Sequence, residues 1–144
     1  MTIVSLFTYC MCRYKNEFNC LLNDKESEEA VLDSVLKFKE AGGGCLVENS
    51  TIGLQRRSTF LKELSERTGV HVIAGTGYYV DPFLNVLNIK TGTTEDMAKH
   101  MISELTIGCV DDASVKCGFI GEIGISNPLT GIIHRTMDQN SKSL

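Results

Sequence analysis

The sequence lacks both an excess of positive charge and any long apolar run. Its 14 lysines and arginines are outnumbered by 18 aspartates and glutamates, which gives a formal net charge of −4 at pH 7. Proteins that bind nucleic acid or an anionic membrane usually carry the opposite balance, so neither partner is expected. No apolar run approaches the roughly 20 residues that cross a bilayer, so we expect no transmembrane helix.

Prolines are also few, two against 13 glycines, and this ratio indicates tight turns rather than linkers. The apolar opening, residues 1–10, has no basic residue before it and therefore makes a poor signal peptide. A chain of 144 residues is long enough for one domain and too short for two. Its 42% hydrophobic and 22% charged residues are typical of a soluble globular protein, for which we expect a cytoplasmic location.

Metal-ligand spacings are missing as well. The three histidines form no HxH or HxxxH pair, and we expect His71 to be structural and His100 to be exposed. The six cysteines do not follow the spacing of a zinc knuckle. Cys45 and Cys117 lie in apolar, strand-like runs, where cysteine behaves as a small hydrophobic residue. Reduced, mostly structural thiols are therefore the favoured interpretation.

Three helical patterns alternate with three strand patterns along the chain. The periodicity of apolar residues predicts helices from Ser27, as a cap, to Ala41, from about Phe60 to Gly69, and from about Thr94 to Gly108. Apolar and β-branched runs predict strands at Cys45–Val47, Val70–Ala74 and Cys117–Ile125. Strands separated by helices imply right-handed crossovers and a parallel α/β sheet, either covered on both faces or closed into a barrel.

Polar residues gather just after the apolar core of each predicted strand: Glu48 to Thr51, Gly75 to Tyr79, and Glu122 to Ser126. The carboxyl ends of parallel strands meet at one edge of a sheet, where sites are usually built. Tyr78 and Tyr79 are neighbours in an extended segment, so one could lie in the core and the other in a pocket. The glycines of this turn are a weak match to a nucleotide-binding loop, because the third glycine is absent.

Glu122 lies in a run that otherwise has the composition of a buried strand. A buried carboxylate needs a cation, a metal ion or several hydrogen-bond donors. A metal ligand and a salt bridge to a nearby lysine or arginine are both open at this point. Gly121 and Gly124 are expected to leave space beside Glu122 for a ligand.

Three segments of the chain are informative when taken together: GGCLVENSTIGL at residues 43–54, TGVHVIAGTGYYVD at 68–81 and KCGFIGEIG at 116–124. They resemble the phosphotriesterase-related proteins, a family of the amidohydrolase superfamily of metal-dependent hydrolases. The resemblance runs from about Glu26 to Leu129, in order and with natural spacing. It divides the chain into an atypical N-terminal segment (1–25), a partial barrel domain (26–129) and a divergent tail (130–144).

The resemblance implies a (β/α)8 barrel of the TIM type, with two divalent metal ions, usually zinc, at the carboxyl ends of the strands. The three predicted strands correspond to the second, third and fourth strands of that barrel. Glu122 falls where relatives carry the acidic ligand that bridges the metals, and Tyr79 falls where relatives place an aromatic residue of the substrate pocket. The expected reaction is hydrolysis of an ester or amide bond in a small molecule, either a phosphotriester or a small N-acyl conjugate.

The chain departs from the family pattern at both ends. No HxH pair precedes the first predicted helix, and the family's later histidines and aspartate do not follow Leu129. About three of eight barrel strands are present, against the roughly 250 residues of a complete barrel. We therefore expect this chain to be catalytically incomplete, and a non-catalytic fragment or interaction chain is the alternative. The sequence predicts no particular oligomeric state.

Overall fold

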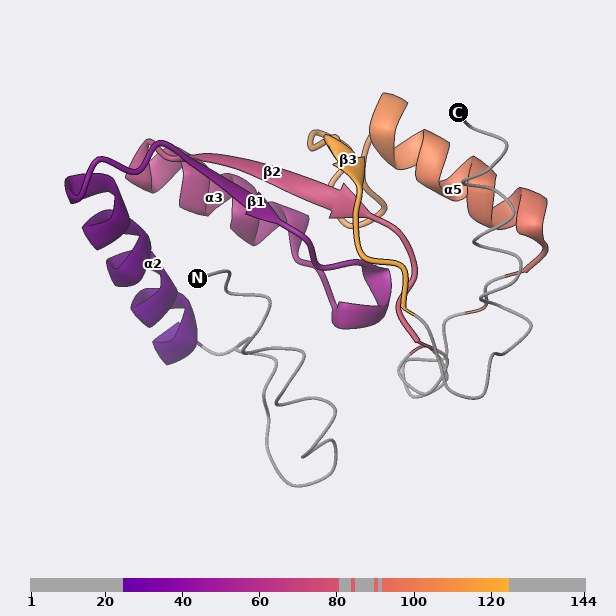
Figure 1. Cartoon of the computed structure of the whole chain (residues 1–144), viewed down its shortest axis with the longest axis horizontal. Helices are drawn as coiled ribbons and strands as arrows, with labels where there is room; N and C mark the ends of the chain where they lie inside the picture. Colours follow the sequence, from indigo (N-terminus) through magenta and orange to yellow (C-terminus); the bar gives the residue numbers. More distant parts are fainter. Residues whose placement is uncertain (1–24, 81–83, 85–89, 91, 125–144) are drawn as a thin grey trace, which may run out of the picture. The chain divides into compact units, whose positions relative to one another are not determined.

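The computed structural model describes residues 25–80, 84, 90 and 92–124 (Figure 1). The predicted N-terminal segment and C-terminal tail lie almost wholly outside these residues. The described elements, in chain order, are α2 (Lys25–Glu40), β1 (Cys45–Glu48), the 3-10 helix η1 (Ile52–Leu54), α3 (Ser58–Thr68), β2 (His71–Thr76), α5 (Thr94–Thr106) and β3 (Phe119–Ile120).

The strands form one sheet in the order β1-β2-β3, and the predicted α/β class with three parallel strands is confirmed. Strand β2 pairs with β3 in parallel, with Gly75 opposite Phe119 and Thr76 opposite Ile120. The third strand is much shorter than the predicted Cys117–Ile125. Gly77 adopts a φ of +145°, which an extended strand does not allow, so regular pairing ends at Thr76.

The described residues divide into two compact units, each treated by itself below. The first comprises residues 25–48 and 60–73, and the second comprises residues 49–59 and the described residues from 74 onward.

The first unit is held by an apolar cluster of α2, α3 and the start of β2. Val35, Leu64 and Val70 form its buried centre, and partly buried neighbours pack around them: Val31, Leu32, Leu46 and Phe60. Apolar periodicity thus marks the packed side of α2 at Val31, Leu32 and Val35. Leu36 and Phe38, which belong to the same predicted pattern, are exposed. Helix α2 begins at Lys25, so Ser27 lies inside the helix and is not its cap.

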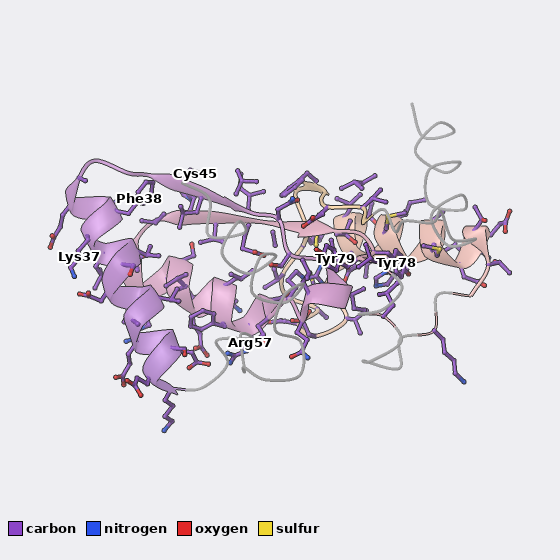
Figure 2. All side chains as sticks on the ribbon, turned by 60° about the horizontal axis from the view of Figure 1, so that its bottom comes forward. Lys37, Phe38, Cys45, Arg57, Tyr78 and Tyr79 are labelled. Atoms are coloured by element: carbon purple, nitrogen blue, oxygen red, sulfur yellow. The ribbon has the colours of Figure 1, made fainter. Side chains whose placement is uncertain are left out.

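Cys45 is exposed on β1, which contradicts its expected role as a buried small residue (Figure 2). Side chains alternate between the two faces of a strand, and Cys45 and Val47 lie on the face of β1 that faces solvent in this unit.

The second unit has its own core, formed by Tyr78, Leu84, Met97 and Met101 with Ile52 packed against them. Helix α5 starts where the sequence predicts. Thr93 and Asp96 form a capping box, in which the Thr93 hydroxyl accepts from the Asp96 N–H and the Asp96 carboxylate accepts from the Thr93 N–H.

Within the described residues, no helix is long and apolar enough to cross a membrane.

Candidate functional site

Glu122 lies two residues beyond β3, at the carboxyl end of the strand. The residue is half-buried rather than fully buried as its neighbours suggested. Its Oε2 atom is buried and accepts no hydrogen bond, and the described part of the chain provides no ion pair for it. Burial raises the pKa of the Glu122 carboxyl above its ordinary value. The salt bridge considered as an alternative therefore has no partner among the described residues.

Residues that follow β1, β2 and β3 converge next to Glu122. A Cβ added to Gly77 would lie 2.9 Å from the Glu122 carbonyl oxygen and 3.2 Å from the methyl of Thr51. A Cβ added to Gly121 would lie 2.8 Å from Asn49 Oδ1. The chain thus brings its polar segments together at the strand ends, as the sequence predicts.

The prediction that Gly121 and Gly124 leave free space beside Glu122 is wrong, because other parts of the chain fill that space. Asn49 approaches Gly121, and a Cβ added to Gly124 would lie 2.5 Å from the backbone nitrogen of Val80. These glycines permit close packing of backbone segments rather than the approach of a ligand.

Both tyrosines of the segment after β2 are buried, each 5% exposed. Tyr78 belongs to the core, and its hydroxyl lies 3.0 Å from Nδ1 of His100. The Cβ of Tyr79 packs against Gly53. The core position of one tyrosine is confirmed, and the pocket role of Tyr79 stays a prediction.

His100 is held between two partners, which contradicts its expected exposure on the helix surface. Besides Tyr78, it approaches Glu104 one turn further along α5, with 3.5 Å between His100 Nε2 and Glu104 Oε1. Its side chain is 19% exposed.

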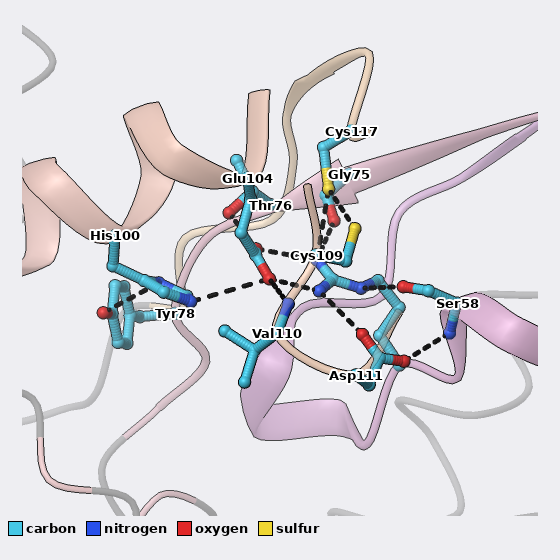
Figure 3. Close-up of polar contacts among 11 residues, drawn as sticks. Ser58, Gly75, Thr76, Tyr78, His100, Glu104, Cys109, Val110, Asp111 and Cys117 are labelled. Atoms are coloured by element: carbon cyan, nitrogen blue, oxygen red, sulfur yellow. Dashed lines mark hydrogen bonds and ion pairs between the residues drawn. The ribbon is translucent and has the colours of Figure 1, made fainter. Parts of the chain in front are cut away.

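Arg56 and Glu104 form a buried ion pair that sequence reasoning missed (Figure 3). The guanidinium donates from Nη1 to Oε2 at 2.9 Å and from Nη2 to Oε1 at 2.5 Å. The two side chains are only 3% and 1% exposed. Two-point pairs of this kind are the strong, geometrically specific form of a charge-assisted hydrogen bond.

The ion pair is the centre of a wider network. Arg56 Nη1 also donates to the carbonyl of Gly75 at 2.8 Å, and the Thr76 hydroxyl donates to Glu104 at 2.6 Å. Asp111 lies 3.5 Å from Arg56 and accepts from the N–H of Ser58, the first residue of α3. The network therefore ties the end of β2 to α5, to the segment before α3 and to the loop before β3.

Burial by itself would raise the pKa of Glu104. The nearby His100, the hydrogen bonds from Arg56 and Thr76, and the charge of Arg56 together outweigh burial and hold this pKa well below its usual range. Glu104 is therefore a carboxylate at neutral pH, and the network balances its charge.

Glu104, Cys109 and Asp111 place ligand atoms within 4.8 Å of one another, close enough in principle for a metal ion. Both oxygens of Glu104 already accept from Arg56, however, and the guanidinium supplies the positive charge there. We therefore interpret this cluster as an arginine-centred network and not as a metal site. A sequence signal existed, because Glu104 extends the buried stripe of Met97 and Met101 at helical spacing.

Comparison with known proteins gives consistent matches over most of the chain. The sequence model of the phosphotriesterase family matches residues 3–143, a longer stretch than the one that carries the resemblance in the sequence. A phosphotriesterase-related protein of Nematostella vectensis is 38% identical over 141 residues, which are 98% of this chain and 39% of that protein. The N-acetyltaurine hydrolase of Bos taurus is 44% identical over 117 residues, which are 81% of this chain and 32% of the relative.

The solved structures agree on a partial barrel. A resiniferatoxin-binding protein from Rhodobacter sphaeroides superposes with a TM-score of 0.70 at 26% identity, covering 80% of this chain and 31% of that one. A phosphotriesterase homology protein from Escherichia coli gives a TM-score of 0.66 over 76% of this chain and 37% of that one. The chain spans 39% and 32% of the lengths of the two curated relatives named above.

Replacing Glu104 by glutamine should destabilise the second unit strongly. The change leaves the buried Arg56 charge without its carboxylate, and breaking a buried pair typically costs about 3–5 kcal/mol. Urea unfolding at neutral pH measures the loss. The matched control is Asp33→Asn, which breaks the exposed pair with Lys37 and should have no measurable effect. The lowered pKa also predicts that the wild-type chain loses this contribution as the pH falls below the ordinary glutamate value of 4.5, whereas Glu104→Gln has a shallower acid dependence.

Replacing Glu122 by glutamine should leave the free energy of unfolding unchanged or slightly higher. The substitution keeps the shape of the side chain and removes a partly desolvated charge whose Oε2 has no hydrogen-bond partner. Urea unfolding measures this beside Glu104→Gln. A loss on the order of 3 kcal/mol would mean that Glu122 neutralises a buried cation, and the metal-ligand interpretation would then be wrong.

Proposed function

The chain belongs to the phosphotriesterase family, and on this basis we propose that it is part of a metal-dependent hydrolase that cleaves an amide or ester bond in a small molecule. Relatives of this chain are hydrolases of that family. The relative from Bos taurus is named for its action on N-acetyltaurine, an N-acyl conjugate, and its 44% identity to this chain favours an N-acyl substrate over a phosphotriester.

The unpartnered Oε2 of Glu122 is the observation that carries the proposal. A carboxylate that is partly desolvated at a strand end, without a cation in the described part of the chain, fits a ligand whose metal is supplied on binding. Carboxylate oxygen is an ordinary zinc ligand, but a catalytic zinc needs about three from the protein. The remaining ligands would have to come from outside the described residues, since the cluster of Glu104, Cys109 and Asp111 does not include Glu122.

Each residue has a separate task in this proposal. Two bound divalent ions, zinc in our proposal, would polarise the scissile carbonyl and lower the pKa of a bound water. Glu122 would hold the cations from the end of β3, and Tyr79 would shape the pocket. Arg56 would act as a positioning residue, because its hydrogen bond to the Gly75 carbonyl fixes the backbone that leads into Tyr79.

We expect the 144-residue chain to show no turnover of N-acetyltaurine, a carboxylester or a phosphotriester, even with added zinc. One carboxylate cannot replace a full ligand set. Release of taurine or of the alcohol measures the rate. Turnover that disappears with a chelator and returns with metal would contradict this expectation.

Metal ligands that the described residues do not provide can be supplied by a relative. Residues 26–129, placed in the matching segment of the N-acetyltaurine hydrolase of Bos taurus, should give a chimera that hydrolyses N-acetyltaurine. Glu122→Gln in the chimera should lower kcat/KM by a factor of about 100 or more, because it removes a metal ligand. The exposed Glu95→Gln on α5 is the control and should leave the rate unchanged. An unchanged rate in the Glu122 variant would contradict the ligand role.

A non-catalytic interaction chain is the second candidate, and exposed apolar residues in the first unit favour it. Val47 on β1 is 52% exposed and Ile73 on the neighbouring β2 is 39% exposed. Exposed apolar side chains on adjacent strands favour association. If this second candidate is right, the purified chain should elute as an oligomer in size-exclusion chromatography. Elution as a stable monomer would contradict it.

A further inference from the structure

Cys109 and Cys117 are a close pair of free thiols in the second unit (Figure 3). Their sulfur atoms lie 3.5 Å apart, and both residues are buried. The segment between them is a tight loop in which the Cys109 N–H donates to the Val115 carbonyl at 2.8 Å. The backbone thus holds the two sulfurs side by side, although eight positions separate them in the sequence.

The residues next to the two cysteines in the loop are exposed. Val110, directly after Cys109, is 73% exposed, and Lys116, directly before Cys117, is also exposed. A local opening of this loop would bring the sulfurs into contact with solvent.

Cys117 also touches the arginine-centred network. Nη1 of Arg56 lies 3.3 Å from its sulfur. Burial raises the pKa of the Cys117 thiol to about 12 even though the charge of Arg56 opposes the shift. While the loop is closed, Cys117 is therefore a protonated and slowly reacting thiol.

We propose that Cys109 and Cys117 form a reversible intrachain disulfide when the loop opens in the presence of a hydroperoxide. The sulfurs need to approach by about 1.5 Å to reach a disulfide bond length. The inference is independent of the hydrolase function, since it rests on the loop geometry alone.

The oxidation balances in two steps. The thiolate of one cysteine attacks an oxygen of hydrogen peroxide, so that an S–O bond forms, the O–O bond breaks and one water leaves after protonation. The second sulfur attacks the resulting sulfenic acid, so that the S–S bond forms, the S–O bond breaks and a second water leaves. The two thiols lose two electrons in total, and the peroxide is reduced to two waters.

Bond formation would draw the Cys117 sulfur toward Cys109 and change its contact with Arg56. The same Nη1 atom holds the Gly75 carbonyl and Glu104. Oxidation of the pair would therefore change the hydrogen bonding of Arg56 at the end of β2.

Peptide mapping of the full chain tests the proposal. The reduced chain is treated with hydrogen peroxide under native conditions, remaining thiols are alkylated, and the chain is digested with trypsin without reduction. Cleavage after Lys99, Lys116 and Arg135 puts Cys109 in residues 100–116 and Cys117 in residues 117–135. A disulfide therefore joins two separate peptides, and their combined mass is lower by two hydrogens.

We expect the linked pair to account for most of the Cys109 signal and to separate on reduction. It should be enriched roughly tenfold over the same treatment in urea, where the loop no longer holds the sulfurs together. Cys45, which is an exposed free thiol in the described part of the chain, is the internal control and should be recovered without a link to either residue. Cys109→Ser should leave Cys117 as an alkylated thiol. Recovery of both cysteines as alkylated thiols, links to other cysteines, or equal linkage in urea would each overturn the proposal.

Discussion

The pairing of Arg56 with Glu104 is the interaction on which the second unit depends. A guanidinium and a carboxylate that are almost completely removed from water are costly unless each satisfies the other. Here Glu104 also accepts a hydrogen bond from the Thr76 hydroxyl, and Arg56 donates one to the Gly75 carbonyl. The end of β2 is therefore held by charged groups as well as by the hydrogen bonds of the sheet. The apolar core around Met97 and Met101 then packs beside a polar centre that allows few alternative arrangements.

Two carboxylates of this unit, Glu104 and Glu122, differ in their hydrogen-bond partners and in the direction in which their pKa is shifted. Glu104 has hydrogen-bond partners on both oxygens, and its pKa is lowered. Glu122 has a buried oxygen with no partner within the described chain, and its pKa is raised. The first is complete within one unit of the chain and is therefore structural. The second has an oxygen without a partner among the described residues, and this supports the proposal that Glu122 is a metal ligand.

Local patterns in the sequence predicted the elements well. Helix α5, the first two strands and the parallel order follow from periodicity and β-branched content, whereas the cap expected at Ser27 was wrong. What they could not predict are contacts between distant residues. Arg56 and Glu104 lie 48 positions apart, and nothing near either residue indicates the other. The extent of β3 was overestimated for the same reason, because the backbone conformation of Gly77, the residue after β2, ends the pairing. His100 was assigned to the surface because the sequence did not indicate that Tyr78 would reach it.

The capping box of α5 has a consequence for how this part of the chain can vary. Thr93 and Asp96 satisfy each other's backbone N–H groups, so the first turn of the helix needs no hydrogen bond from the residues that precede it. Upstream, Leu84 packs against Met97 and Met101, so a change of length is tolerated only between Leu84 and Thr93. Within that interval the sequence can lengthen or shorten while α5 keeps its own first turn.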